Sequence, residues 1–212
     1  MNKYIKYPRT FHLPWSEGAT DDDKRLKNIS FFLGKEVIVT EKLDGENCTM
    51  YHDHLHARSI DSKDHPSRHW VKMLHATISH DIPKNWRLCG ENMYAKHSIY
   101  YKQLTSYYYL FSIWNEQNNC LSWNETLEWA QLLQIPTAPV LYEGLFDEEK
   151  IRSLSTKRSV FGGEQEGYVV RLADSFHYDE FKTSVAKFVR KNHIQTDQHW
   201  LNQSIIPNGI MD

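Results

Sequence analysis

The sequence predicts an α+β fold built on antiparallel sheets. Short segments rich in β-branched and aromatic residues recur along its 212 residues, and turn residues separate several of them. Helical patterns fall between some of these segments, but without the strand–helix–strand alternation of a doubly wound parallel sheet. Neither repeats nor low-complexity segments occur. We therefore expect mixed strands and helices around antiparallel sheets.

Composition indicates an ordinary globular domain with a sizeable core. Charged residues make up 25% of the chain and hydrophobic residues 40%, and the formal net charge is −2. Any contact with nucleic acid must therefore use a local basic surface. Cys48, Cys89 and Cys120 are odd in number and lack CxxC spacing, so they indicate neither a disulfide framework nor a zinc site. No signal peptide and no long apolar run appears, which predicts a cytoplasmic protein without membrane association.

The first half of the chain divides into an irregular start, a strand cluster and a helix. Residues 1–35 are polar, carry two prolines and an acidic run, and are expected to form an irregular segment. Strands are expected within residues 36–58, with turns at Asp44-Gly45 and at His52-Asp53-His54. After Pro66 the apolar residues between 70 and 78 have helical spacing, and Pro83 ends that helix.

The second half alternates less regularly between strands and helices. Strands are expected at 86–91, 107–114, 167–172 and 185–189. A helix begins at Ser122 or Asn124 as N-cap and runs to about Gln134, before Pro136. Shorter helical patterns lie at 148–154 and at 196–204.

Lys42-Leu43-Asp44-Gly45, which follows Glu41, is the segment that most clearly suggests chemistry. A lysine amine can attack the α-phosphorus of a nucleoside triphosphate and carry the nucleotide as a phosphoramidate. For that, its pKa must fall through desolvation or neighbouring cations. Asp44 is expected on the same side of an extended chain as Lys42, and the glycine permits a tight turn close to phosphates. The alternative interpretation is a strand that ends in an Asp-Gly hairpin turn.

Five further positions could complete such a site, although each also has an ordinary structural explanation. An arginine at a strand end can hold phosphate, a carboxylate beside a glycine suits a ribose hydroxyl, and an aromatic residue in a strand can stack on a purine. A second carboxylate before a strand can hold Mg²⁺, and a lysine in a late strand can neutralise phosphate charge. The residues in these roles are Arg58, Glu91, Phe111, Glu166 and Lys187.

Taken in order, these positions resemble the covalent nucleotidyltransferase superfamily of polynucleotide ligases and mRNA capping enzymes. The pattern Glu41-Lys42-x-x-Gly45-x-Asn47 is most similar to ATP-dependent RNA ligases of the type-2 class, which carry Asn where DNA ligases usually carry Arg. The likeness spans residues 36–191. It implies the ligase adenylation-domain fold, with antiparallel sheets flanking a nucleotide pocket and helices outside.

The resemblance implies a role for each matched residue. Lys42 would be the adenylated nucleophile, with Glu41 contacting adenine through its backbone and Leu43 and Asp44 in the same nucleotide-binding segment. Asn47 would lie near the phosphates, and Arg58 would be the second motif's arginine. Glu91 would bind the ribose and Phe111 would stack on the purine ring. Glu166 would be the metal-site glutamate, and Lys187 would be the lysine of the last motif.

Two departures from the family pattern affect what can be expected. The last motif usually reads Lys-x-Lys, but Val185 and Val189 flank Lys187, so the second lysine role is unfilled or passes to Arg190 or Lys191. Residues 36–212 are expected to form the adenylation domain alone, with no C-terminal OB-fold. A protein partner could then supply recognition of the strand ends.

The resemblance implies an enzyme that uses ATP with Mg²⁺ or Mn²⁺ to join RNA ends bearing a 5′-phosphate and a 3′-hydroxyl. The alternatives are a DNA or mixed-substrate ligase, a GTP-using capping enzyme, and a non-catalytic module that binds nucleic-acid ends. Tyr7-Pro8-Arg9 could fold over the nucleotide pocket, although simple packing is the plainer interpretation. Twelve histidines are present, but their spacing does not indicate a metal site.

Overall fold

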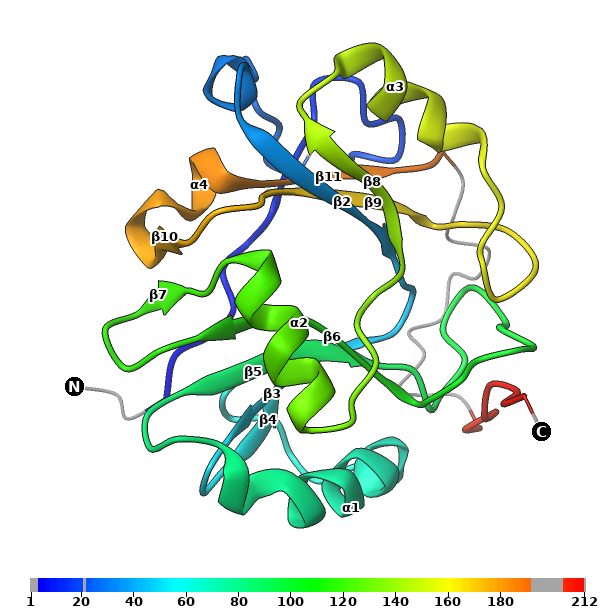
Figure 1. Cartoon of the computed structure of the whole chain (residues 1–212). Coiled ribbons are helices and arrows are strands. Elements are labelled where there is room, and N and C mark those ends of the chain that lie inside the picture. The colour runs from blue at the N-terminus through cyan, green and yellow to red at the C-terminus, as the bar shows by residue number, and fades with distance from the viewer. Residues whose placement is uncertain (1–3, 21, 192–203, 212) are drawn as a thin grey trace.

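Two sheets face each other in the computed structural model, which describes residues 4–20, 22–191 and 204–211 (Figure 1). The first sheet has the strand order β1-β11-β9-β2-β8, and only its β1–β11 pair is parallel. Its strands are β1 (Phe11–His12), β11 (Val185–Val189), β9 (Gly167–Leu172), β2 (Glu36–Lys42) and β8 (Val140–Leu145). The expected α+β fold with antiparallel sheets is confirmed.

The second sheet is antiparallel and has the order β10-β7-β6-β5-β3-β4. Its strands are β10 (Phe176–His177), β7 (Asn119–Cys120), β6 (Tyr108–Trp114), β5 (Arg87–Asn92), β3 (Glu46–Tyr51) and β4 (Leu55–Ala57). The Asp-Gly turn joins β2 of the first sheet to β3 of the second. The Lys42 motif therefore lies where the chain passes from one sheet to the other.

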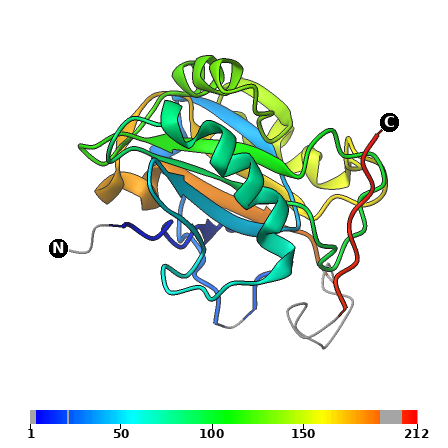
Figure 2. The same ribbon diagram turned by 90° about the horizontal axis from the view of Figure 1, so that it is seen from below.

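The helices lie outside the two sheets (Figures 1 and 2). Helices α1 (His69–Ile78) and α2 (Trp123–Leu132) contribute to an apolar core with Met50, Leu88 and Leu110 of the second sheet. Helix α3 (Glu148–Ser153) packs Ile151 into the core of the first sheet with Val37, Val39 and Val170, and α4 (Phe181–Ser184) leads into β11. Short 3₁₀ helices occupy Ser30–Phe32, Pro66–Arg68, Ser79–Asp81, Leu154–Thr156 and Tyr178–Glu180.

Local sequence explains where the predicted helices begin and end. The Ser122 hydroxyl accepts a hydrogen bond from the Glu125 backbone N–H at 3.3 Å, and the Glu125 carboxylate accepts one from the Ser122 N–H at 2.9 Å. This reciprocal capping box opens α2, as expected for Ser122. The helix ends at Leu132, and Gln134 then adopts a positive φ of 54° ahead of Pro136.

Several elements were not predicted. Within the described residues of the segment 1–35, Phe11 and His12 pair in parallel with β11, an isolated bridge joins His12 to Arg25, and Ser30–Phe32 form a 3₁₀ helix. Strand β8 was missed because it is an exposed edge strand whose burial shows no two-residue alternation. Strands β7 and β10 have two residues each and α4 has four, which is too short for periodicity to reveal them. The helix expected at 196–204 lies outside the described residues except for residue 204.

No helix in the described part of the chain is both long enough and apolar enough to span a membrane.

Candidate active site

A cavity of about 410 Å³ lies between the inner faces of the two sheets. Side chains alternate between the two faces of a strand, so Val37 and Val39 of β2 enter the outer core while Thr40 and Lys42 face the cavity. The same alternation directs residues of β9, β11 and the second sheet inward. The predicted residues that line the cavity are Glu41, Lys42, Leu43, Asn47, Arg58, Glu91, Phe111 and Lys187.

Lys42 is ion-paired with Glu166. Its Nζ donates a hydrogen bond to Glu166 Oε2 at 2.8 Å, although the two residues are 124 positions apart. The pairing of β2 with β9 brings them together, because Lys42 lies opposite Gly167 in that ladder. The Lys42 side chain is 25% exposed and that of Glu166 is 5% exposed. The amine is therefore accessible from the cavity while its carboxylate partner lies behind it.

The charges around Lys42 do not lower its pKa in the resting protein. Burial disfavours the ammonium form, but the carboxylates of Glu166 and Glu91 outweigh burial and raise the pKa of Lys42. Burial raises the pKa of Glu166 to about 7 and that of Glu91 to about 8, in spite of attraction to Lys42. The lowered pKa that an attacking amine needs is therefore not present in the protein without a ligand. A nucleophilic amine requires a ligand that draws the carboxylates away from Lys42 or adds positive charge.

Gly45 brings the Lys42 motif close to β5. Its backbone N–H donates a hydrogen bond to the Glu91 carboxylate. A Cβ atom at residue 45 would lie 2.6 Å from both the Asn92 carbonyl oxygen and the Met93 sulfur. A side chain cannot fit there without displacing this strand, so the glycine permits close approach of backbone to backbone. From the sequence we expected Gly45 to let the backbone approach phosphates. In the structure it lets the backbone approach β5.

Asp44 does not follow Lys42 into the cavity. Strand β2 ends at Lys42, and the chain bends at Asp44, so the expected alternation stops there. The Asp44 carboxylate instead accepts backbone hydrogen bonds from Ser98 and Ile99, both at 2.7 Å. Leu43 is 3% exposed and packs into an apolar cluster that includes Ile99. Asp44 and Leu43 thus hold the loop that follows Lys42 in place.

Glu41 and Asn47 retain polar atoms without partners among the described residues. The Glu41 side chain accepts a hydrogen bond from the Val160 N–H at 3.2 Å, and its Oε1 is buried without a partner. Burial raises the pKa of this carboxyl group. The Asn47 side-chain oxygen is also buried without a partner, in a residue that lines the cavity. Buried polar atoms are normally satisfied, so these two indicate places where a ligand could bind.

One end of the cavity is aromatic. Phe111 packs against Tyr7 with ring centroids 5.2 Å apart in an edge-to-face arrangement, and Trp114 and Phe176 also line this region. Burial raises the pKa of the Tyr7 hydroxyl well above its usual range. Val169 lies on the inner face of the other sheet. An aromatic ring with an aliphatic side chain on the facing sheet suits a flat heteroaromatic base.

Sequence reasoning missed Arg171, which also lines the cavity. The residue is 4% exposed, and its guanidinium donates to the backbone oxygens of Leu121 at 2.7 Å and Leu172 at 3.0 Å. Its position two residues after Val169 on an inward-facing strand was the available signal, because the same face carries both. Ser112 is a further lining residue that no motif indicated, whereas Tyr7 belongs to the segment named above as one that could fold over the pocket.

Arg58 and Lys187 bring positive charge to the cavity. Burial, followed by repulsion from Lys42, lowers the pKa of Lys187 to about 8. Arg190 instead pairs with Glu164 at the surface at 2.6 Å, and Lys191 is exposed. Neither is among the described residues that line the cavity, so the structure does not place the second lysine role of the last motif with either one.

The sequence matches the RNA ligase family over residues 35–189. The chain belongs to the RNA ligase family. The matched region contains Lys42, Glu166 and every other predicted site residue. A search of curated proteins found no match.

Solved structures of an RNA ligase from Naegleria gruberi share the fold. The form with pyrophosphate has a TM-score of 0.62 and 20% identity, covering 88% of this chain and 61% of that one. A mutant form with ATP and manganese has a TM-score of 0.61 and 18% identity, covering 84% and 57%. This chain therefore spans about three-fifths of the length of the Naegleria structures.

Proposed function

We propose that this member of the RNA ligase family is an ATP-dependent RNA ligase that forms a covalent adenylate on Lys42. The observation that carries the proposal is the Lys42 amine, ion-paired with Glu166 and accessible from a cavity that has an aromatic end and a cationic side. A nucleotide would place its base beside Phe111 and its phosphates toward Arg58 and Lys187. The α-phosphorus would then lie near the amine.

Three successive reactions follow from this arrangement. The Lys42 amine attacks the α-phosphorus of ATP, forms an N–P bond and displaces pyrophosphate. The 5′-phosphate of RNA then attacks the same phosphorus, breaks that N–P bond and takes the adenylyl group. A 3′-hydroxyl finally attacks the activated 5′-phosphate, so that the RNA ends are joined and AMP leaves.

The other residues of the cavity bind and orient in this proposal. Glu91, near the Lys42 loop, would accept a hydrogen bond from a ribose hydroxyl. Glu41 would contact adenine through its backbone, and Asn47, with its unpartnered oxygen, would lie near the phosphates. Leu43 and Asp44 hold the loop that carries the nucleophile. Arg58 and Lys187 would stabilise negative charge on the phosphoryl oxygens.

A divalent metal ion fits this chemistry at Glu166. The described residues hold no group of three or more His, Cys, Asp or Glu side chains that could bind a metal by themselves. Mg²⁺ and Mn²⁺ can bind through one or two carboxylates and substrate phosphates, so Glu166, which contacts Lys42, could supply the protein ligand. Such an ion would supply positive charge next to the transferring phosphoryl group. It would also favour ionised Glu166, whose pKa burial raises to about 7.

The nucleotide donor is the first testable prediction. ATP should label the protein covalently, whereas GTP and NAD should label it at least tenfold less, because we assign the aromatic end of the cavity to adenine and its cationic side to a triphosphate. The measurement is incubation with each α-labelled donor and Mg²⁺ or Mn²⁺, followed by denaturing electrophoresis. Stronger labelling by GTP would favour a capping guanylyltransferase, and no labelling by any donor would favour a non-catalytic end-binding module.

The proposed polynucleotide is RNA with a 5′-phosphate and a 3′-hydroxyl. Sealing of matched RNA and DNA nicks by the adenylated protein separates an RNA ligase from a DNA or mixed-substrate ligase. Faster sealing of DNA than of RNA would contradict the RNA assignment.

A further inference from the structure

A second cavity of about 630 Å³ adjoins the first. The two share Arg58, Lys187 and two residues of the N-terminal segment, whereas Lys42 lines only the first. Lys6 and Arg9 add two more cations, against the single carboxylate of Asp23. A protein with a net charge of −2 thus gathers four basic side chains around one hollow. Concentrated positive charge of this kind favours an anion.

Lys187, which lines both cavities, forms no direct ion pair within the described residues, although the carboxylates of Asp23 and Glu166 attract it. Its side chain makes no hydrogen bond or ion pair with any residue in the described part of the chain, and it is partly buried. Burial and repulsion from Lys42 lower its pKa to about 8. A partly buried cation without a direct partner carries a partial desolvation penalty that a bound anion would offset. Lys187 therefore supplies an observation, independent of the charge count, that indicates an anionic ligand.

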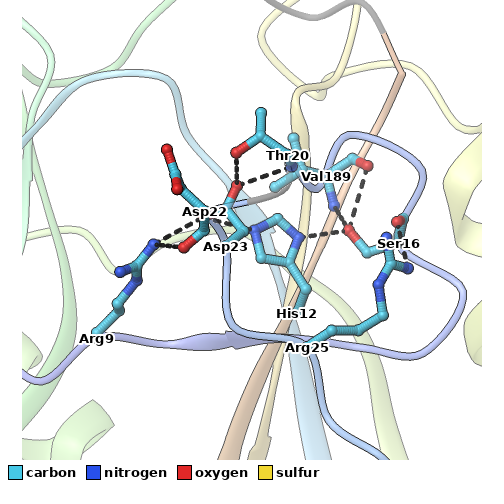
Figure 3. A network of polar contacts seen from close by, with 8 residues as sticks. All are labelled: Arg9, His12, Ser16, Thr20, Asp22, Asp23, Arg25 and Val189. Atoms are coloured by element: carbon cyan, nitrogen blue, oxygen red, sulfur yellow. Dashed lines mark hydrogen bonds and ion pairs between the residues drawn. The ribbon is translucent and has the colours of Figure 1, made fainter.

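Arg9 is held at the rim of the second cavity by a polar network (Figure 3). Its Nη2 donates to the Asp22 backbone oxygen at 2.8 Å and to the Asp23 carboxylate at 3.2 Å. Thr20 donates two further hydrogen bonds to Asp23. Burial alone would raise the pKa of Asp23, but these hydrogen bonds and the contacts with His12 and Arg9 lower it to about 2. Asp23 stays ionised at neutral pH, so its ion pair with Arg9 persists.

The same network connects this rim to the strand that carries Lys187. His12 pairs with Lys187 in the β1–β11 ladder, and its Nδ1 lies 2.7 Å from the Ser16 hydroxyl. That hydroxyl accepts a hydrogen bond from the Val189 N–H at 2.9 Å, as Figure 3 shows. Arg9 and Lys187 are therefore positioned relative to each other by ordered backbone and buried side chains.

The geometry of phosphoryl transfer suggests a role for the second cavity. Entering and leaving groups lie roughly in line on opposite sides of phosphorus. When Lys42 attacks ATP, pyrophosphate must leave on the side away from the amine. When the adenylyl group moves on, the RNA 5′-phosphate must enter on that side while the lysine nitrogen leaves. Both reactions therefore need a phosphate site beyond the α-phosphorus, away from Lys42.

We propose that the second cavity is a phosphate-binding site formed by Arg9 and Lys6 of the N-terminal segment with Arg58 and Lys187. This inference rests on the proposed function and assigns phosphate binding during ligation to the N-terminal segment. The phosphate could come from the β- and γ-phosphates of ATP, released as pyrophosphate, or from the 5′ end of the RNA. Tyr7 lines both cavities, so the same short segment bounds the base end and the phosphate site.

The test compares Arg9→Ala and Lys6→Ala with Lys27→Ala. Lys27 is exposed, lies in the same N-terminal segment and lines neither cavity, so it controls for the loss of one positive charge. Lys6→Ala guards against a folding effect, because the Lys6 side chain makes no hydrogen bond or ion pair within the described residues. Thermal unfolding checks each variant.

Two binding measurements distinguish the sources of phosphate. Calorimetry with inorganic pyrophosphate reports the first source, and fluorescence anisotropy with matched 5′-phosphate and 5′-hydroxyl RNA reports the second. We expect Arg9→Ala to lower pyrophosphate affinity, the preference for 5′-phosphate RNA, or both, on the order of tenfold, as loss of one charged hydrogen bond would. Loss in one arm alone assigns the site to that source. Unchanged binding in both arms for Arg9→Ala and Lys6→Ala, relative to Lys27→Ala, would overturn the proposal.

Covalent labelling of the wild-type protein by ATP, measured in the same preparation, separates this inference from the proposed function. If wild-type protein is labelled and Arg9 proves dispensable for phosphate, only the second site is wrong. If wild-type protein is not labelled but phosphate binding still depends on Arg9, the phosphate site stands and the ligase assignment fails.

Discussion

Lys42→Arg should form no covalent adenylate. The guanidinium preserves the positive charge beside Glu166, but it does not deprotonate near neutral pH and cannot become a nucleophile. Labelling with α-labelled ATP should therefore fall to background, a loss of at least a thousandfold. Lys35→Arg is the matched control, because Lys35 is exposed and lies outside the cavity.

The same substitution should spare the last reaction in part. Attack by a 3′-hydroxyl on an adenylated 5′ end needs no lysyl nucleophile. Lys42→Ala and Lys42→Arg should therefore still join a pre-adenylated RNA supplied without ATP, more slowly if the ammonium also stabilises charge. An acid-labile, base-stable AMP adduct on Lys42→Arg would place the nucleophile elsewhere.

Glu166→Gln should slow adenylation on the order of 10²–10³-fold, because the proposed metal ligand and its charge are removed together. The neutral amide keeps the volume of the side chain. It also removes the main interaction that raises the pKa of Lys42. In metal-free protein, the pH at which Lys42 becomes reactive toward an acylating reagent should therefore fall. That measurement reports the electrostatic effect without requiring catalysis.

Glu164→Gln is the control for this substitution. Glu164 lies two residues away, is exposed and pairs with Arg190 at the surface. It should leave both the adenylation rate and Lys42 reactivity unchanged. Equal effects of the two substitutions, in proteins that unfold at the same temperature, would show that the loop and not the Glu166 carboxylate is responsible.

The sequence was most informative for residues at strand ends, because the pairing of two strands then determines which residues lie next to each other in the fold. Lys42 is the last residue of β2 and Glu166 immediately precedes β9, so pairing of β2 with β9 was enough to bring them together. Glu91 and Phe111 also line the cavity, as the order of the motifs and the family resemblance implied. These residues could be predicted because motif order can be read directly from the sequence.

Asp44 and Arg9 show why the remainder could not be predicted. The orientation of Asp44 depends on backbone donors at residues 98 and 99, in a loop with no periodic pattern. Arg9 reaches the second cavity because a two-residue strand pairs with β11 and a network at Asp23 holds it. Both depend on tertiary contacts made by irregular segments, for which local sequence carries little information.

Peptide mapping of the protein after incubation with ATP and a divalent metal most directly tests the central claim. The protein is digested under conditions that preserve a phosphoramidate, and the adducted residue is located by tandem mass spectrometry. We predict one adenylyl group, on Lys42, that disappears when pyrophosphate is added and the reaction reverses. An adenylyl group on any other residue, or no adduct in folded protein that binds ATP, would contradict the account.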